Sequence, residues 1–285
     1  IMKNYKISIL IANYNNGHFF KDCYDSLINQ TLQEFEVVVL DDCSSDDSFE
    51  VIQNIIKKDD RFKLFKNDTN RKVGFTKRKL VELANSEICG FLDPDDALKP
   101  KALEIMVECH FKNIEAGLIY SDFIYCTENL EEVRIHNAKQ IEGFGNPNFY
   151  NMKGEISHFA TFKKSIYNKT SGINPYYKIA EDQDWYLKIV DIAPSIHINE
   201  ALYLYRIHKG GISTNNNSDR AFFWHWVAII NAAERRGTDV DKLFYDYFVR
   251  INKLKHLEDK INSLKNSRLL KILYKLGIFK AYKYL

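Results

Sequence analysis

The stretch Val37-Val38-Val39-Leu40-Asp41-Asp42 decides the fold, because an apolar run leads directly into two carboxylates. A second stretch repeats the pattern, with Phe91-Leu92 followed by Asp93-Pro94-Asp95-Asp96. Short apolar runs that end in polar residues are typical of parallel strands buried on both faces. Open α/β sheets bind their ligands beyond the carboxyl ends of such strands. The two acidic strand ends therefore predict a ligand crevice.

The second acidic stretch places three negative charges within four residues, at Asp93, Asp95 and Asp96. Charges this close repel one another unless a cation or a hydrogen-bonded ligand compensates them. Mg²⁺ and Mn²⁺ take oxygen ligands from carboxylates and from phosphates. The turn therefore predicts a divalent metal that carries a diphosphate. The structural alternative is a solvated acidic turn that caps the helix after Pro100.

Strand-like and helix-like segments alternate between residues 5 and 125. Their order predicts an α/β domain with a largely parallel sheet covered by helices. After residue 127 this alternation of strands and helices stops, and helical segments dominate the last part of the chain. We therefore expect a first domain over residues 1–215 and a helical extension over residues 216–285. The expected strands are 7–12, 37–40, 62–65, 88–92, 116–125 and 195–205, with a helix over 181–190 and a long loop over 142–155.

The bulk composition is that of an ordinary globular protein, with 45% hydrophobic and 27% charged residues in a chain of 285. Five cysteines without a CxxC pair argue against a disulfide framework and against a zinc ribbon, and favour a reducing compartment. The N-terminal apolar run is too short for a signal peptide, and no stretch approaches the roughly 18 apolar residues of a membrane-spanning helix. A cytoplasmic location is therefore expected.

The basic charge of the chain is concentrated in its C-terminal tail. Residues 253–285 hold nine Lys or Arg against Glu258 and Asp259, a net charge of +7, whereas the whole chain carries +2. A basic amphipathic helix of this kind can lie on an anionic membrane surface. Peripheral contact with the inner face of the membrane is one expectation, and packing on the protein itself or in a homo-oligomer is the other. Nucleic acid is not an expected partner, because no RNA-binding aromatic motif or groove-reading helix accompanies the charge.

Six short motifs follow one another over about residues 5–213. They are Ile7-Ser8-Ile9-Leu10-Ile11-Ala12-Asn13-Tyr14-Asn15, Val39-Leu40-Asp41-Asp42-Cys43-Ser44-Ser45-Asp46, Gly74 to Arg78, Phe91-Leu92-Asp93-Pro94-Asp95-Asp96, Glu181-Asp182 and Tyr205-Arg206-Ile207-His208. This ordered set resembles family 2 of the glycosyltransferases. The resemblance implies a GT-A fold, which is Rossmann-like. It also implies transfer of a monosaccharide from a nucleotide sugar, above all a UDP-sugar, to a hydroxyl acceptor in bacterial surface-glycan synthesis, with inversion at the anomeric carbon.

The resemblance implies which residues bind the donor. Ala12 and Tyr14 would line the nucleobase pocket, and Asp41 would accept a hydrogen bond from the base. Asp93 would contact the ribose. Arg78 would contact the donor from a segment where the family usually has Ala-Arg-Asn, and where this chain departs from the pattern on both sides of the arginine. Asp42 would anchor the turn and the following helix.

The resemblance also implies a metal site and a general base. Asp95 would be a ligand of Mn²⁺ or Mg²⁺, and His208 would ligate the metal or bond the diphosphate. A single displacement needs one carboxylate to take the proton of the acceptor hydroxyl. Asp182 would be this base, with Glu181 as the neighbour or the alternative and Asp184 as a weaker candidate. The acceptor would be a glycan or a lipid-linked glycan.

Two other function classes compete with this interpretation. A nucleotidyl or phosphoryl transferase of the P-loop or dinucleotide-binding kind is disfavoured, because the chain has neither GxxxxGKS nor GxGxxG. The alternative from a different class is a non-catalytic glycan- or nucleotide-binding scaffold on the same fold. Retention of all the acidic positions of the motifs argues against a protein that has lost catalysis.

Overall fold

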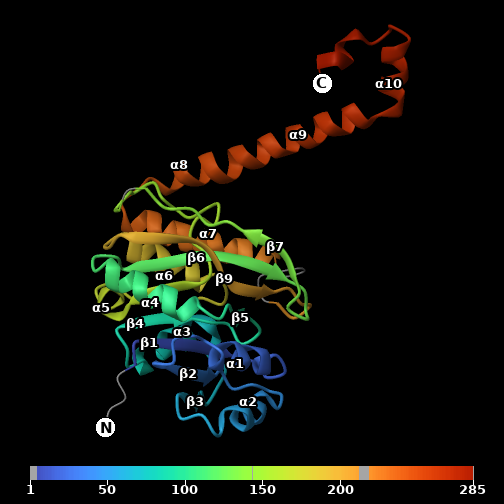
Figure 1. Ribbon diagram of the computed structural model, residues 1–285. Coiled ribbons are helices and arrows are strands. Elements are labelled where there is room, and N and C mark those ends of the chain that lie inside the picture. Colours follow the sequence, from blue (N-terminus) through green and yellow to red (C-terminus); the bar gives the residue numbers. More distant parts are fainter. Residues whose placement is uncertain (1–4, 143, 212–217, 285) are drawn as a thin grey trace. The chain divides into compact units, whose positions relative to one another are not determined.

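The structure is a computed structural model that describes residues 5–142, 144–211 and 218–284 (Figure 1). The chain divides into two compact units, Ile1–Ala232 and Ala233–Leu285. Each unit is considered by itself. The domain boundary expected at residue 215 falls between residues 211 and 218 and lies outside the described residues.

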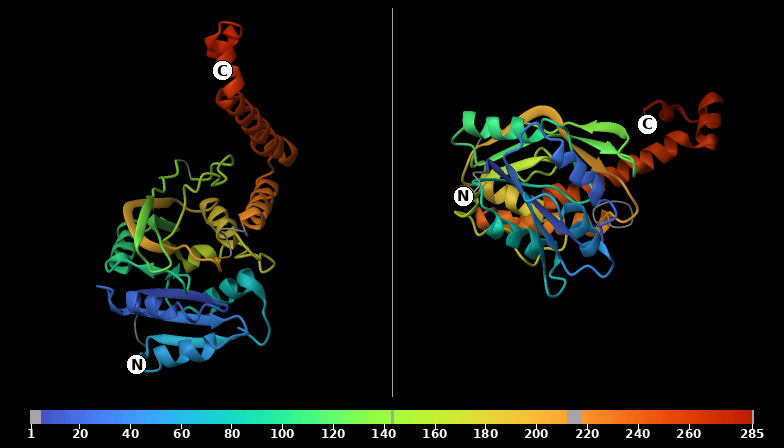
Figure 2. Two further views of the ribbon diagram at one scale, coloured as in Figure 1. Left: turned by 90° about the vertical axis from the view of Figure 1, so that its right-hand side faces the viewer. Right: turned by 60° about the horizontal axis from the view of Figure 1, so that its bottom comes forward.

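Four parallel strands form the N-terminal half of the sheet, and they lie side by side in both views of Figure 2. Strand β1 (Ile7–Asn13) pairs with β2 (Phe35–Asp41) on one side and with β4 (Ile88–Phe91) on the other, and β2 also pairs with β3 (Phe62–Lys66). Every residue of β2 is buried. Burial on both faces explains the continuous apolar run of residues 37–40.

Helices cover both faces of this half-sheet. Successive strand residues point to opposite faces, so Ile9 packs in one core and Leu10 in the other. The first core contains apolar side chains of α1, α2 and α4, and the second contains those of α3 and α6. The bounds are α1 (Phe20–Ile28), α2 (Ser48–Ile56), α3 (Lys72–Leu83), α4 (Ala102–Lys112) and α6 (Glu181–Val190).

The second half of the sheet is mixed, so the parallel pattern holds for the first four strands and not beyond them. Strand β8 runs antiparallel to both β4 and β6, whereas β9 runs parallel to β6. The strand order is β3-β2-β1-β4-β8-β6-β9-β5, and β7 pairs with β6. The additional elements are β5 (Ala97–Leu98), β6 (Leu118–Cys126), β7 (Glu132–His136), β8 (Ala160–Lys163), α5 (Lys164–Tyr167) and β9 (Ser195–Arg206).

The segments that follow are helical. Helix α9 exposes Leu254, Leu257, Ile261 and Leu264. No helix in the described part of the chain is both long enough and apolar enough to span a membrane. The bounds are α7 (Ser218–Arg235), α8 (Val240–Phe244), the π-helix η2 (Tyr245–Val249), α9 (Arg250–Asn266), α10 (Arg268–Lys275) and the 3₁₀ helix η3 (Lys280–Tyr284).

Candidate functional site

The carboxyl ends of β1 and β2 are joined through Asp41, which is fully buried. Its carboxylate accepts hydrogen bonds from Asn13 Nδ2 at 2.8 Å, from the Ser44 backbone N–H at 2.9 Å and from Ser44 Oγ at 2.6 Å. The side-chain oxygen of Asn13 is buried and has no hydrogen-bond partner among the described residues. Leaving a buried acceptor unsatisfied is unfavourable, so Asn13 Oδ1 is a place where a ligand N–H would bind.

Ala12 and Tyr14 flank this buried pair at the end of β1. Tyr14 is 44% exposed, so its side chain is accessible to a ligand. Asp42 plays a structural part instead. Its carboxylate accepts hydrogen bonds from Asn67 Nδ2 and from the backbone N–H groups of Arg71 and Lys72, each at 2.8 Å. Asp42 therefore anchors the start of α3, not the helix that follows it directly in sequence.

The acidic turn after β4 is tied to β9 by Asp96, which is 2% exposed. Its carboxylate accepts hydrogen bonds from Tyr203 Oη at 2.6 Å and from the Arg206 backbone N–H at 2.7 Å. Burial and the neighbouring Asp95 and Asp93 raise the pKa of Asp96 well above its ordinary value. The side chain is thus committed to holding the turn, and Asp93 and Asp95 are the turn carboxylates without this role.

Asp95 and His208 lie together, as the sequence predicts for two residues at one site. Asp95 Oδ2 is 2.8 Å from His208 Nε2, and the Phe19 ring packs edge-on against the imidazole at 4.7 Å. Within the described ranges, no group of three or more His, Cys, Asp or Glu side chains forms a metal site by itself. A carboxylate oxygen and an imidazole nitrogen nevertheless fit an ion such as Mn²⁺ that takes further ligands from a substrate diphosphate.

A buried lysine joins the acidic turn to α6. Lys77 Nζ lies 2.7 Å from Glu181 Oε1 and 3.3 Å from Asp93 Oδ1, and the lysine side chain is 7% exposed. Burial would lower the pKa of Lys77, but the two carboxylates outweigh it and hold that pKa well above its usual value. The same lysine helps to lower the pKa of Asp93 against the effect of burial. Burial raises the pKa of Glu181 in spite of Lys77.

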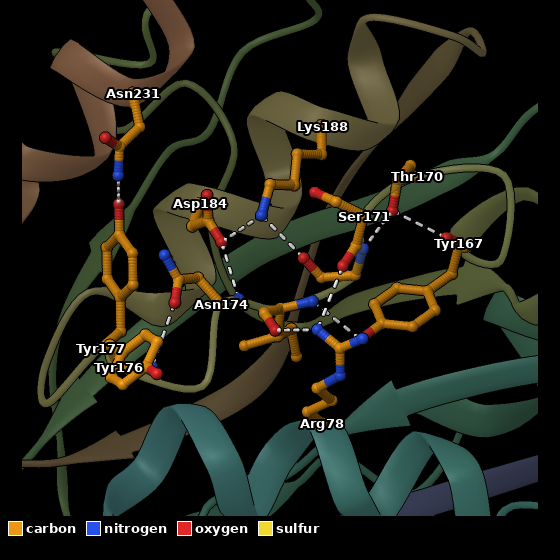
Figure 3. A network of polar contacts seen from close by, with 12 residues as sticks. Arg78, Tyr167, Thr170, Ser171, Asn174, Tyr176, Tyr177, Asp184, Lys188 and Asn231 are labelled. Carbon is orange, nitrogen blue, oxygen red and sulfur yellow. Dashed lines mark hydrogen bonds and ion pairs between the residues drawn. The ribbon is translucent and has the colours of Figure 1, made fainter. Parts of the chain in front are cut away.

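Arg78 contacts a loop of the protein itself. Its guanidinium donates hydrogen bonds to the backbone oxygens of Ser171 and Ile173, both at 3.1 Å, as Figure 3 shows. Successive helical residues point about 100° apart, so Lys77 and Arg78 have different surroundings. Lys77, and not Arg78, lies beside the acidic turn. The signal for this was the spacing of Lys77 with Leu80, Val81 and Ala84, which puts it on the apolar face of α3.

The loop of residues 167–177 is fixed between α3 and α6. Asp184 accepts hydrogen bonds from Lys188 Nζ at 2.7 Å and from the Asn174 backbone N–H at 3.0 Å, and Lys188 also donates to Gly172 (Figure 3). A Cβ atom added to Gly74 would lie 2.6 Å from the Asn174 backbone oxygen, so only glycine permits this approach. Asp184 is therefore a support for the loop and drops out as a candidate base.

The first turn of α6 holds the two remaining carboxylates. Glu181 is 4% exposed and is engaged by Lys77. Asp182 accepts a hydrogen bond from the Gln183 backbone N–H at 2.8 Å and borders a small cavity. The other residues that line this cavity come from α3, from β4 and the turn after it, from the start of β8 and from α6: Lys77, Phe91, Asp93, His158, Ala160, Trp185 and Tyr186.

Comparison with known proteins gives the family and the fold that this chain resembles. The family described as "Glycosyl transferase family 2" matches residues 8–171. The chondroitin synthase of Escherichia coli is 30% identical over 206 residues, which are 71% of this chain and 29% of that protein. The chain spans only 27–29% of the length of the first three curated relatives.

Two solved structures resemble the fold. S. aureus TarS 1-349 in complex with UDP-GlcNAc has a TM-score of 0.63 and 17% identity, covering 91% of this chain and 80% of that one. The mannosyltransferase PcManGT from Pyrobaculum calidifontis, in complex with GDP-Man and Mn²⁺, has a TM-score of 0.66 and 15% identity, covering 98% of this chain and 82% of that one. Both neighbours have the GT-A fold, and the present chain shares it.

Proposed function

Because the chain belongs to glycosyl transferase family 2, we propose that it transfers a monosaccharide from a nucleotide sugar to a hydroxyl acceptor in glycan synthesis. One observation carries the proposal. Lys77 links Asp93, on the turn that would hold the donor, to Glu181, the neighbour of the candidate base Asp182. A single displacement at a sugar carbon requires that the residues that bind the donor and the general base be held close together.

The donor is proposed to be a UDP-sugar bound at the carboxyl ends of β1, β2 and β4. Tyr14 offers an exposed ring for stacking on the base, and Ala12 borders it through the backbone. Asp41 and the unpaired Asn13 Oδ1 supply acceptors for the base N–H. Asp93 would meet the ribose. The complex of the fold neighbour TarS with UDP-GlcNAc supports this class of donor.

The diphosphate is proposed to bind with Mn²⁺ or Mg²⁺ at Asp95 and His208. When bound, the metal would neutralise charge on the diphosphate. The complex of PcManGT with Mn²⁺ supports a metal on this fold. The chain's own contribution is to hold the two ligands together, since Arg206 donates a hydrogen bond to the Asp95 backbone oxygen at 2.5 Å.

Asp182 is the proposed general base. It removes the proton of the acceptor hydroxyl while that oxygen attacks the anomeric carbon on the face opposite the nucleotide. The bond from the anomeric carbon to the diphosphate breaks, the electron pair leaves with the UDP oxygen, and the configuration inverts. Glu181 is the weaker candidate, because its carboxylate is occupied by Lys77.

Replacing Asp95 with Asn is expected to abolish the metal-dependent part of UDP binding. Ligand that binds only the native state adds RT ln(1 + [L]/Kd), about 2.7 kcal/mol at a hundredfold Kd. We expect UDP with Mn²⁺ to raise the melting temperature of the wild type more than UDP alone, and the variant to lose that difference. The exposed Asp68→Asn is the matched control. Equal shifts with and without Mn²⁺ in the wild type would exclude the metal site.

The acceptor is proposed to be a glycan, carried on lipid at a membrane surface that the basic tail contacts. We expect the full chain to cosediment with vesicles containing phosphatidylglycerol and not with phosphatidylcholine alone. Each Lys near an anionic surface contributes about 1 kcal/mol, so the triple variant Lys271→Glu, Lys275→Glu and Lys280→Glu is expected to weaken binding more than a hundredfold. The exposed control set is Lys57→Glu, Lys58→Glu and Lys112→Glu. If the chain binds anionic and neutral vesicles equally, the basic tail does not recognise an anionic surface, and packing of the tail on protein becomes the better explanation.

A further inference from the structure

The small cavity beside Asp182 combines polar and aromatic walls. Phe91, Trp185 and Tyr186 give it flat apolar sides, and the charged groups of Asp93 and Asp182 border it as well. Its free volume is about 10 Å³, which is close to the space that one water molecule needs. The cavity therefore has room for a single hydroxyl-sized group.

His158 is a wall of this cavity that none of the motifs in the sequence singles out. Its imidazole stacks on Tyr203 at 5.0 Å with an interplanar angle of 21°, and on Tyr205 at 5.9 Å with 22°. Tyr203 is itself held by Asp96 through a 2.6 Å hydrogen bond. The plane of the His158 ring is thus fixed by the same strand that fixes the acidic turn.

Two polar groups of the cavity lack partners among the described residues. The imidazole of His158 has no hydrogen bond to another described side chain or backbone group. The indole nitrogen of Trp185, a residue that is 1% exposed, is buried without an acceptor. An unpaired buried polar group such as the indole nitrogen is unfavourable in a folded protein. His158 is partly buried, so its imidazole borders the cavity with its hydrogen-bonding capacity unused, and a ligand group in that space can pair with it.

The imidazole is suited to a neutral ligand group. Burial lowers the pKa of His158, and the nearby carboxylates of Asp93 and Asp182 oppose that effect without reversing it. A neutral imidazole has one N–H donor and one nitrogen acceptor. A hydroxyl group is both a donor and an acceptor, so it can pair with either nitrogen of the imidazole.

The position of the cavity indicates which part of the substrate would contribute the hydroxyl group. Under the proposed function, Asp93 contacts the donor and Asp182 receives the proton of the attacking hydroxyl. The sugar that moves must lie between them, because its anomeric carbon is where the new bond forms. His158 shares the cavity with both carboxylates and therefore borders the transferred sugar.

We propose that His158 is a specificity-determining residue that hydrogen-bonds one hydroxyl group of the transferred sugar. This inference rests on the proposed function. It adds the requirement that the donor sugar carries a free hydroxyl at the position that enters the cavity.

The test compares UDP with UDP-sugars in calorimetric titrations in the presence of Mn²⁺. The panel is UDP-glucose, UDP-galactose, UDP-GlcNAc and UDP-glucuronate. His158→Phe keeps a flat ring on the two tyrosines and removes both nitrogens. We expect the Kd for UDP to stay within about twofold of the wild type, and the Kd for the preferred UDP-sugar to rise by about tenfold, as loss of one buried hydrogen bond implies. His197→Gln, which removes a stacked imidazole outside the cavity, is the control.

Deoxy analogues of the preferred donor identify the hydroxyl. Wild type and His158→Phe should bind one deoxy analogue equally well, because the contact is already missing on the ligand side. Equal loss of affinity for UDP and for UDP-sugar would show a structural role and overturn the inference, as would unchanged affinity for both. Wild-type protein that binds no UDP-sugar would instead overturn the proposed function on which the inference rests.

Discussion

Asp182→Asn is expected to lower the rate of sugar transfer by about 10²–10⁴-fold, the usual contribution of a positioned general base. The amide has the shape of the carboxylate but cannot take the proton of the acceptor hydroxyl. The Kd for UDP should stay unchanged, since Asp182 meets the reacting centre and not the nucleotide. The measurement is kcat with the preferred donor, alongside a UDP titration.

Two companion variants sharpen that result. Asp191→Asn changes an acidic residue at the end of the same helix and should keep the wild-type rate. Glu181→Gln removes the partner of Lys77, so it should weaken donor binding as well as slow transfer. Turnover that survives in Asp182→Asn and disappears in Glu181→Gln would move the base to Glu181.

Lys77→Met is expected to cost about 3–5 kcal/mol of unfolding free energy at pH 7.5, the usual effect of breaking a buried ion pair from one side. The change leaves the carboxylates of Asp93 and Glu181 near each other without their shared cation. Donor binding should be lost too, because repulsion then opposes a diphosphate at the same place. Urea unfolding gives the free energy, and a UDP titration gives the binding.

The loss should become smaller as the pH falls. Burial already raises the pKa of Glu181 with the lysine present, and removing Lys77 raises it further. A carboxyl group with a raised pKa in the folded state binds more protons folded than unfolded, so stability rises on acidification. We expect the deficit at pH 5 to be clearly smaller than at pH 7.5. A deficit that is equal at both pH values would contradict this account.

Matched variants separate charge from size. Lys79→Met removes a half-exposed lysine of the same helix whose ion pair with Glu82 is on the surface, and it should change stability by less than about 0.5 kcal/mol. Lys77→Arg keeps the positive charge and should restore most of the stability. Wild-type stability in Lys77→Met would show that the carboxylates do not depend on this cation.

The positions of the main strands along the chain were predicted from the sequence, because buried parallel strands require unbroken apolar runs. The runs before Asp41 and Asp93 became β2 and β4, and the helix over residues 181–190 and the strand over 195–205 were also found. The short strands β5 and β7 and the strand β8 were not expected. Their pairing is set by distant partners such as β9 and β6, which local pattern does not reveal.

The acidic residues show what the local sequence pattern cannot predict, namely which carboxylates serve a ligand and which serve the fold. In sequence, Asp42, Asp96 and Asp184 look like carboxylates that bind a ligand. The structure shows each of them accepting hydrogen bonds from the protein itself, from donors that lie up to 110 residues away. Local sequence does not reveal which carboxylates are used in this way to hold the fold.

The sequence by itself determined the fold class and the two acidic strand ends, since these follow from apolar runs and ordered motifs. Tertiary structure decided that Asp95 lies against His208, that Lys77 and not Arg78 lies beside the acidic turn, and that His158 joins the cavity. The rotation of α3 about its axis relative to the sheet determines which of its side chains lies beside the acidic turn. The stacking of His158, just before β8, on Tyr203 of β9 determines the position of His158. The orientation of α3 and the position of His158 both depend on contacts between segments far apart in the chain. The burial of side chains between such segments stabilises them, and local sequence does not show which segments meet.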